Sequence, residues 1–373
     1  MTATFIPGLE LARLFYAEAV RPLLDENFPG LPHTAALIGP GSEVLGLDTP
    51  RSTDHDWGPR LQLFLTDAAA DAGLATAISG LLTARLPGEF RGYPTVFAWS
   101  GASPGRHSHH VVVAGLRDWL LGALGFDAFT PVGLLDWLAT PTQVLASITG
   151  GAVFHDGLAE VGAGLAGVRA RLRWYPPDIW LYVLACQWQR ISQEEPFPGR
   201  CAEVGDELGS MLLAARLARD LMRLVLLAQR RYPPYGKWLG TAFARTPVGA
   251  DLAPLLAAAI SAPGWPDRER SLCAAYEAAA RLHNTLGVTA PLDPAVRPNF
   301  YDRPFRISDA GRFVGALRDR IGDETVRSLP LIGAVDQFVD STDAIGNHAL
   351  RRAAVGARFG PAVSGTDRRP AKG

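Results

Sequence analysis

The stretch that most constrains the fold is the turn Gly39-Pro-Gly-Ser42 followed by Asp54-His-Asp56, with residues 43–53 as the spacer. Side chains two residues apart on a strand point to the same face, so the two carboxylates converge if this segment is extended. Convergent carboxylates repel each other unless a cation lies between them. Mg²⁺ takes one or two carboxylates and completes its octahedron with water and substrate phosphates. The spacing therefore predicts a magnesium site at Asp54 and Asp56.

The turn before these acids suits the same kind of substrate. Residues 34–38 have the pattern of a short buried strand that runs into Gly39 and Gly41. Glycines allow tight backbone geometry and close approach of a ligand to main-chain N–H groups, and Ser42 adds a hydroxyl donor. A phosphate-binding turn beside a metal-binding acid pair indicates phosphoryl or nucleotidyl transfer. The alternative is a glycine turn plus a solvated Asp-x-Asp, but the ordered pair of motifs favours function.

With these motifs the chain resembles the nucleotidyltransferase superfamily, whose pattern is an apolar strand, Gly-Ser, a spacer near this length and Asp-x-Asp. It is more similar to a bacterial family with that fold which is catalogued as a domain of unknown function. Residues 205–210, 232–238 and 333–340 resemble later blocks of that family. The resemblance covers about residues 1–350. It implies an α+β fold, with a small mixed-sheet nucleotidyltransferase domain followed by an all-α helical bundle domain.

Composition agrees with a globular protein of two domains. Hydrophobic residues make up 48% of the 373 residues and charged residues 20%, which excludes a disordered chain. The formal charge of −1 gives no overall attraction to nucleic acid or membrane. The three cysteines have neither metal spacing nor an even number, so a reducing cytoplasm is the expected compartment. We expect neither a signal peptide nor a membrane span.

Hydrophobic periodicity places the elements along the chain. Strands are expected at residues 60–65, 94–98, 110–113 and 150–156, and helices at 9–21, 68–85, 117–124, 179–194, 205–231, 250–260 and 267–285. The first helix should end near Pro22. Asp178 should be the N-cap of the helix at 179–194. Strand patterns end at about residue 157. We therefore expect a nucleotidyltransferase-like domain at 1–157, a helical domain at 158–350 and a disordered tail at 351–373.

The superfamily usually takes a third carboxylate from a later strand, and this chain departs from that pattern. The corresponding strand is expected at residues 109–113, which contain no acid. His110 is a candidate replacement as a neutral general base, because its unperturbed pKa lies near neutrality. Otherwise the third acid comes from elsewhere in the fold, or catalysis is weakened or lost. His107, His109 and His110 resemble a metal ligand set, but a solvated strand entry is the favoured interpretation.

Tyr235, Lys237 and Trp238 follow a Pro-Pro stop and combine an aromatic platform with a cation. The resemblance to kanamycin nucleotidyltransferase-type proteins, which have a helical second domain, implies that Tyr235 and Lys237 contact the nucleotide and that the lysine neutralises triphosphate charge. The alternative is that both rings pack against a helix end while Lys237 is solvated. The residues alone leave these two interpretations open.

The resulting hypothesis is Mg²⁺-dependent transfer of a nucleotidyl group, most simply adenylyl, from ATP or another NTP to a hydroxyl acceptor. Asp54, Asp56 and His110 are the predicted catalytic residues, with Asp54 and Asp56 as metal ligands and Gly41, Ser42, Tyr235 and Lys237 as nucleotide contacts. The acceptor is a small molecule, a protein or a nucleic acid hydroxyl. The alternative is a catalytically inactive nucleotide-binding or regulatory module that retains the fold.

Overall fold

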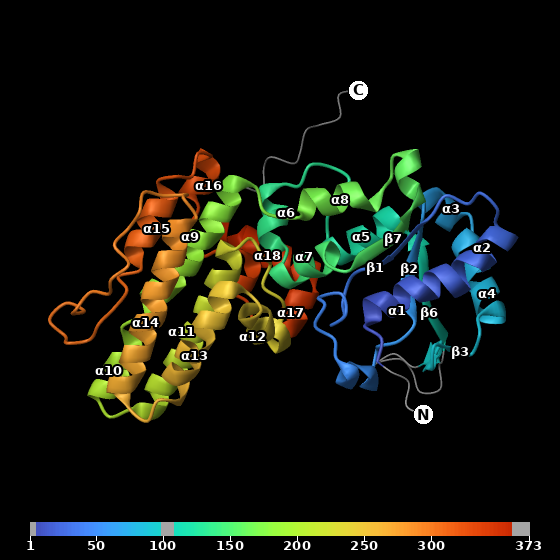
Figure 1. The fold of residues 1–373 in the computed structure, drawn as a ribbon. Coiled ribbons are helices and arrows are strands. Elements are labelled where there is room, and N and C mark those ends of the chain that lie inside the picture. Colours follow the sequence, from blue (N-terminus) through green and yellow to red (C-terminus); the bar gives the residue numbers. More distant parts are fainter. Residues whose placement is uncertain (1–4, 98–107, 360–373) are drawn as a thin grey trace, which may run out of the picture. The chain divides into compact units, whose positions relative to one another are not determined.

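The computed structural model describes residues 5–97 and 108–359, and the chain divides into two units. Unit 1 comprises Met1–Gly133 and Val144–Arg173, and unit 2 comprises Leu134–Gln143 and Trp174–Gly373. The fold is α+β: a small mixed sheet with its helices forms unit 1, and helices build unit 2 (Figure 1).

A five-stranded mixed sheet in the order β5-β6-β2-β1-β7 lies at the centre of unit 1. β1 pairs antiparallel with β2 and with β7, whereas β2 and β6 are parallel. β3 and β4 form a separate two-stranded sheet. The strands are β1 Thr34–Leu37, β2 Arg60–Leu65, β3 Glu89–Phe90, β4 Tyr93–Pro94, β5 Val96–Phe97, β6 Ser108–Gly115 and β7 Ala152–Asp156.

The predicted strands around β1, β2, β6 and β7 are confirmed, and β2 is the most central of them. All six residues of β2 are buried, because the strand is central in the sheet. Gln62, at a polar position of the alternation, bonds with both main-chain groups of Ile38: its Nε2 donates to the carbonyl at 3.0 Å, and its Oε1 accepts from the N–H at 3.1 Å. Gln62 thus continues the β1–β2 ladder past the end of β1.

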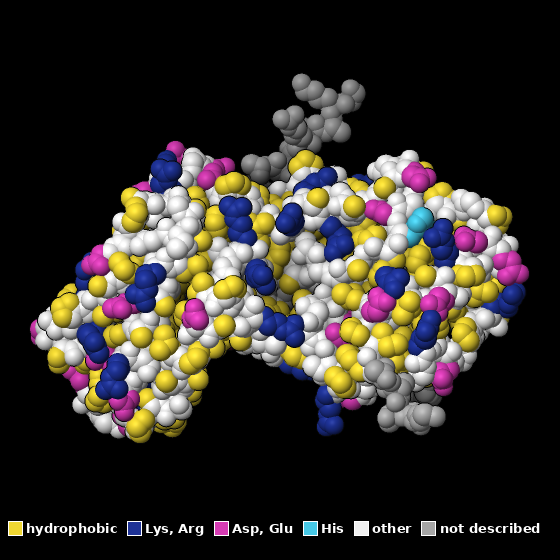
Figure 2. Space-filling model, viewed as in Figure 1, with side chains coloured by type: hydrophobic (Ala, Val, Ile, Leu, Met, Phe, Trp, Pro, Cys, Tyr) yellow, Lys and Arg dark blue, Asp and Glu magenta, His cyan; other side chains and the backbone are white. Residues whose placement is uncertain are grey.

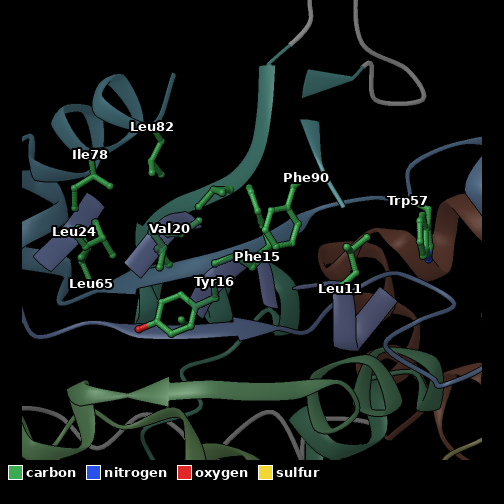
Figure 3. Packing of buried hydrophobic residues seen from close by; sticks show 14 residues of the cluster. Leu11, Phe15, Tyr16, Val20, Leu24, Trp57, Leu65, Ile78, Leu82 and Phe90 are labelled. Carbon is green, nitrogen blue, oxygen red and sulfur yellow. The ribbon is translucent and has the colours of Figure 1, made fainter. Parts of the chain in front are cut away.

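Helices pack their apolar side chains against this sheet. Figure 3 shows Leu11, Phe15 and Val20 from the first helical segments in one cluster of buried residues, to which Leu65 of β2 and Leu82 of α4 also belong. Each such side chain contributes about 1.5–3 kcal/mol by leaving water. The helices of unit 1 are α1 Gly8–Phe15, a π-helical turn Tyr16–Val20, α2 Arg21–Asn27, α3 Asp67–Asp71, α4 Leu74–Arg85, α5 Leu116–Leu124, α8 Leu165–Leu172 and the 3₁₀ helices Pro50–Asp54 and Gly157–Val161.

The prediction that the first helical segment ends near Pro22 is wrong, because the segment continues to Asn27. The π-helical turn Tyr16–Val20 lies between α1 and α2, and Pro22 falls in the first turn of α2. A proline there costs little, because the first N–H groups of a helix have no partner within the helix. The wider turn therefore lets a proline follow α1 while the chain stays helical.

Unit 2 is built from helices, and α9, α11, α13 and α14 run side by side (Figure 1). They cover the expected helical segments, and none of the helices in the described ranges has the length and apolar character needed to cross a membrane. The helices are α6 Leu134–Ala139, α9 Pro177–Glu194, α10 Phe197–Glu203, α11 Glu207–Ala228, α12 Gly236–Ala244, α13 Pro247–Ser261, α14 Trp265–Thr285, α15 Gly311–Arg318, α16 Glu324–Ser328, the 3₁₀ helix Val335–Gln337, α17 Thr342–Gly346 and α18 His348–Phe359. α7, Thr142–Thr149, crosses the division between the units.

Two acids at helix starts have different roles. Asp206 is the N-cap of α11, and its carboxylate accepts from the N–H of Gly209 at 2.8 Å. Asp178 was predicted as the N-cap of α9, but Pro176 occupies that position. Its carboxylate instead accepts from the N–H groups of Gly322 and Asp323 at 3.1 and 2.8 Å. Asp178 therefore ties the start of α9 to the segment before α16.

The division of the chain differs from the predicted domains. Unit 1 extends to Arg173, beyond the expected boundary at residues 157 and 158, because α8 contacts β7. Unit 2 also takes Leu134–Gln143 from inside the first domain, since α6 packs with α18. The predicted tail at 351–373 is helical up to Phe359 in α18, and residues 360–373 lie outside the described residues.

Glu195, directly after α9, is a buried acid held by main-chain donors. Its carboxylate accepts from the N–H groups of Ser308 at 2.6 Å and Ala310 at 3.0 Å. Burial raises the pKa of Glu195 from 4.5 to about 7, against the effect of those N–H donors. Because this pKa is raised in the folded state, the contribution to stability is complete below the unfolded pKa and is lost as pH rises through about 7.

We expect the wild type to lose about 3 kcal/mol of stability relative to the Glu195→Gln variant between about pH 5 and about pH 8. The neutral amide imitates the protonated acid, so the variant lacks this titration. Urea unfolding of both proteins across this range measures the difference. Their comparison cancels other titrations, such as that of His283, whose pKa is lowered by burial to about 4. A stability difference that stays constant with pH would contradict the prediction.

Candidate functional site

One edge of the sheet in unit 1 gathers the residues singled out in the first half of the sequence. β1 and β2 are antiparallel, so the end of β1 and the start of β2 lie at the same edge. β6 starts at this edge too, since it runs parallel to β2 and pairs His110 with Arg60. The segments that carry Gly41 and Ser42, Asp54 and Asp56, and His110 therefore meet there. We call this edge the turn edge.

The turn after β1 requires glycine at two positions. Gly39 has φ +88° and Gly41 has φ +152°, both in the range that side chains disfavour. A Cβ atom at Gly41 would also collide with the Arg60 guanidinium and lie 2.7 Å from a carboxylate oxygen of Glu43. The Ser42 carbonyl accepts from the N–H groups of Leu45 and Leu47, which closes the turn. Gly41 is needed because an ion pair packs against the turn, whereas Gly39 is needed for its positive φ.

That ion pair, Glu43 with Arg60, is the part of the turn edge that sequence reasoning missed. Arg60 Nε donates to Glu43 Oε1 at 2.7 Å, and Arg60 Nη2 donates to the carbonyl of Pro40 at 2.7 Å. Both side chains are buried: Arg60 is 8% exposed and Glu43 is 3% exposed. The available signal was an arginine at the first position of an apolar strand, which needs an acid partner when buried. The pair fixes the backbone that carries Ser42.

Asp54 and Asp56 lie at this edge in a different conformation from the one predicted. Asp54 ends the 3₁₀ helix Pro50–Asp54, and Asp56 has φ +50°, so the two acids do not alternate on a strand. Pro50 suits the first turn of a helix, and Gly58 with φ +156° separates the acids from β2. Asp54 is 57% exposed, and its Oδ1 lies 2.8 Å from Nδ1 of His55.

The donor chemistry of the two acids suits Mg²⁺, which needs only one or two carboxylates when water and phosphate oxygens complete its shell. In residues 5–97 and 108–359 no cluster of three or more His, Cys, Asp or Glu side chains is placed to hold a metal ion. Asp54 and Asp56 are the two carboxylates of the motif that could hold a cation at the turn edge. Of the histidine cluster, His107 lies outside the described residues, and His109 Nε2 lies 3.1 Å from the carbonyl oxygen of Ser79.

His110 is buried and held in one orientation. Its Nε2 lies 2.7 Å from the carbonyl oxygen of Phe97, and the two rings stack with centroids 3.4 Å apart. A carbonyl oxygen only accepts, so Nε2 carries the proton and Nδ1 carries the lone pair. Burial lowers the pKa of His110, the Phe97 carbonyl and the Asp56 carboxylate oppose this, and the Arg60 cation adds to it. The lowered pKa favours the neutral imidazole, whose Nδ1 is buried.

Tyr235 and Lys237 belong to unit 2, where they line a pocket of about 430 Å³ that we call the α12 pocket. Three cations and two acids line it: Arg219 and Arg223 from α11, Lys237 from α12, Asp336 from the 3₁₀ helix and Asp340. Sequence reasoning identified Tyr235 and Lys237 but not the pocket. The other charged residues lie many positions away, and no local spacing links them.

Asp336 organises the inner side of this pocket. Its Oδ2 accepts from the hydroxyl of Thr142 at 2.5 Å and from Arg223 Nη2 at 2.7 Å, and its main-chain carbonyl accepts from Arg223 Nη1 at 2.8 Å. The carboxylate is 3% exposed and the guanidinium 12%. Asp336 therefore neutralises the charge of Arg223 and fixes the position of its guanidinium group.

The comparisons with known proteins concern the middle of the chain. A sequence-family profile described as "Domain of unknown function (DUF4037)" matches residues 137–239. The resemblance to a family of unknown function is confirmed for that stretch. It contains Arg219, Arg223, Tyr235 and Lys237 of the α12 pocket, whereas Asp54 and the rest of the turn edge lie outside it. No curated protein and no solved structure matches the chain.

Proposed function

We propose that the protein transfers a nucleotidyl group, most simply adenylyl, from a Mg²⁺-bound NTP to a hydroxyl acceptor. The observation that carries this proposal is the turn edge, where the sheet topology joins the Gly41-Ser42 turn, the Asp54–Asp56 segment and His110. The order of these motifs along the chain resembles the nucleotidyltransferase pattern. Unit 1 supports the proposal with a small mixed sheet of the kind that this pattern implies.

Each group has a role that its chemistry suits. The N–H groups of the turn and the hydroxyl of Ser42 bind phosphate oxygens. Asp54 and Asp56 hold the cation, which neutralises the phosphates when bound. His110 Nδ1 takes the proton of the acceptor hydroxyl while the hydroxyl oxygen bonds to the α-phosphorus. The bond from that phosphorus to the bridging oxygen breaks, and pyrophosphate leaves with both electrons of the bond.

The test is Mg²⁺-dependent incorporation of label from α-³²P-ATP, with cell extract as a mixed source of acceptors. Transfer of label with release of pyrophosphate supports the proposal, and the labelled species identifies the acceptor as a small molecule, a protein or a nucleic acid. ATP that binds without transfer to any acceptor would contradict it. The same assay with the other three NTPs shows the base preference.

A second candidate is a nucleotide-binding module without catalysis. The favouring observation is that β6, Ser108–Gly115, contains no Asp or Glu, so the third carboxylate of the superfamily pattern is missing from the strand expected to carry it. If calorimetry detects ATP binding and no label is transferred to any acceptor, the results support this second candidate. A cytoplasmic location is proposed for either one, since Cys186, Cys201 and Cys273 are all free thiols.

A further inference from the structure

A row of exposed apolar side chains follows the start of α11 in unit 2. Leu208 is 69% exposed, Met211 39% and Leu212 60%. Val204, in the turn before the helix, is 79% exposed. Figure 2 shows hydrophobic and charged side chains interspersed over the visible face, so a single exposed apolar side chain needs no explanation. Four large ones within residues 204–212 do need one.

The row has the spacing of a helix-packing face. Leu208, Met211, Leu212 and the half-buried Ala215 follow one another at i, i+3, i+4 and i+7, so they share one side of α11. We call this side the α11 stripe. The other side of α11 is buried against α9, α10, α13 and α14. A helix that is apolar on both sides is normally covered on both, so the stripe fits a partner from outside the chain.

Charges of opposite sign lie at the two ends of the stripe. Glu203 and Asp206 precede it, whereas Arg216 and Arg219 lie at its far end. The side chains of Arg216, Arg219 and Glu203 are 57%, 45% and 37% exposed. Each of the three has an ion-pair partner within the chain at the surface, and such pairs contribute little. A helix with acids at one end and bases at the other complements itself when it is turned end for end.

We infer that two copies of this chain associate through their α11 stripes, with the helices antiparallel and a two-fold axis near Met211. Asp206 and Arg216 are each five residues from Met211, so the axis brings Asp206 toward Arg216 of the second copy. Glu203 and Arg219 are each eight residues away, so they meet in the same way. A parallel arrangement would place acid beside acid, and the antiparallel one also aligns the helix dipoles favourably.

A second copy fits the stripe better than other occupants do. Spacing that is equal on both sides of Met211 is what a two-fold interface requires, and an apolar centre with a charged rim is the usual anatomy of an interface. A helix that lies on a membrane instead surrounds its apolar face with basic residues, whereas acids lie at one end of this stripe. All these residues belong to unit 2, so the inference does not depend on the reaction proposed for unit 1.

Sedimentation equilibrium of the full chain, over a series of concentrations, tests the association. We expect a dimer for the wild type and at least about hundredfold weaker association for Leu208→Glu, because the axis puts each new carboxylate into the apolar centre twice. The fold should survive, since an acid suits the first turn of a helix. Leu350→Glu is the matched control, because Leu350 is 54% exposed on α18 and lies outside the stripe. A monomeric wild type, or equal association of wild type and Leu208→Glu, would overturn the inference.

Charge reversal tests the antiparallel register. Glu203→Lys and Arg219→Glu each place like charges across the interface and should weaken association by about tenfold. The double variant exchanges the two signs and should restore association. A double variant weaker than both single variants would overturn the proposed pairing. So would a monomeric wild type that binds phosphatidylserine vesicles through Leu208, which would identify a membrane as the occupant.

Discussion

Replacing Asp54 or Asp56 with asparagine is expected to abolish nucleotidyl transfer, with a loss of at least about 100-fold in the rate of label incorporation from α-³²P-ATP. Asparagine keeps the shape of the side chain but removes the charge that a hard divalent cation requires. The fold should survive, because Asp54 is exposed and asparagine tolerates the positive φ of Asp56. Unchanged thermal unfolding of both variants would show that the loss is chemical.

Asp71→Asn provides the matched control for these variants. Asp71 is an exposed acid of α3, away from the motif segments, so the same substitution there should leave the rate unchanged. Full activity of Asp54→Asn would remove this residue from the proposed site.

The strands of unit 1 were predictable because their signal is local. Short apolar runs at β1, β2 and β6 are bounded by glycine, proline and polar residues, and a strand needs no other information to be recognised. The conformation of the acid motif was not predictable in the same way. Pro50 and Gly58 flank the motif, and these two residues decide that the chain forms a 3₁₀ helix before β2 starts. The prediction of an extended segment used the spacing of the acids and neglected these neighbours.

The partners of the buried charges could not be found from the sequence, because they are distant along the chain. Glu43 and Arg60 are 17 residues apart, and Arg223 and Asp336 are 113 apart. A helical or strand period links residues only within one element. Likewise, the chain leaves unit 1 at Leu134, contributes α6 to unit 2 and then returns, whereas the predicted boundary assumed a single crossing. Only tertiary packing determines such pairings.

The Glu43–Arg60 pair leads to the second large prediction, on the stability of unit 1. Glu43→Gln should destabilise it by about 3–5 kcal/mol, because the buried guanidinium of Arg60 loses the charge of the carboxylate that it binds. The double variant Glu43→Leu/Arg60→Met should lose less, since well-packed apolar side chains replace a buried ion pair at little cost. Glu26→Gln is the surface control: its pair with Arg85 is exposed, and a change below about 1 kcal/mol is expected.

Hydrogen exchange followed by mass spectrometry measures this effect where it should occur. Amides of β1 and β2 are expected to lose protection in Glu43→Gln, while those of α13 and α14 in unit 2 keep theirs, because the pair lies wholly in unit 1. A loss in Glu43→Gln no larger than that in Glu26→Gln would show that the buried pair does not hold the turn. Restored protection but absent transfer activity in the double variant would have a specific meaning. The pair would then serve to position the Gly41-Ser42 turn for phosphate, because apolar side chains can fill the space beneath the turn but cannot donate to the Pro40 carbonyl as Arg60 does.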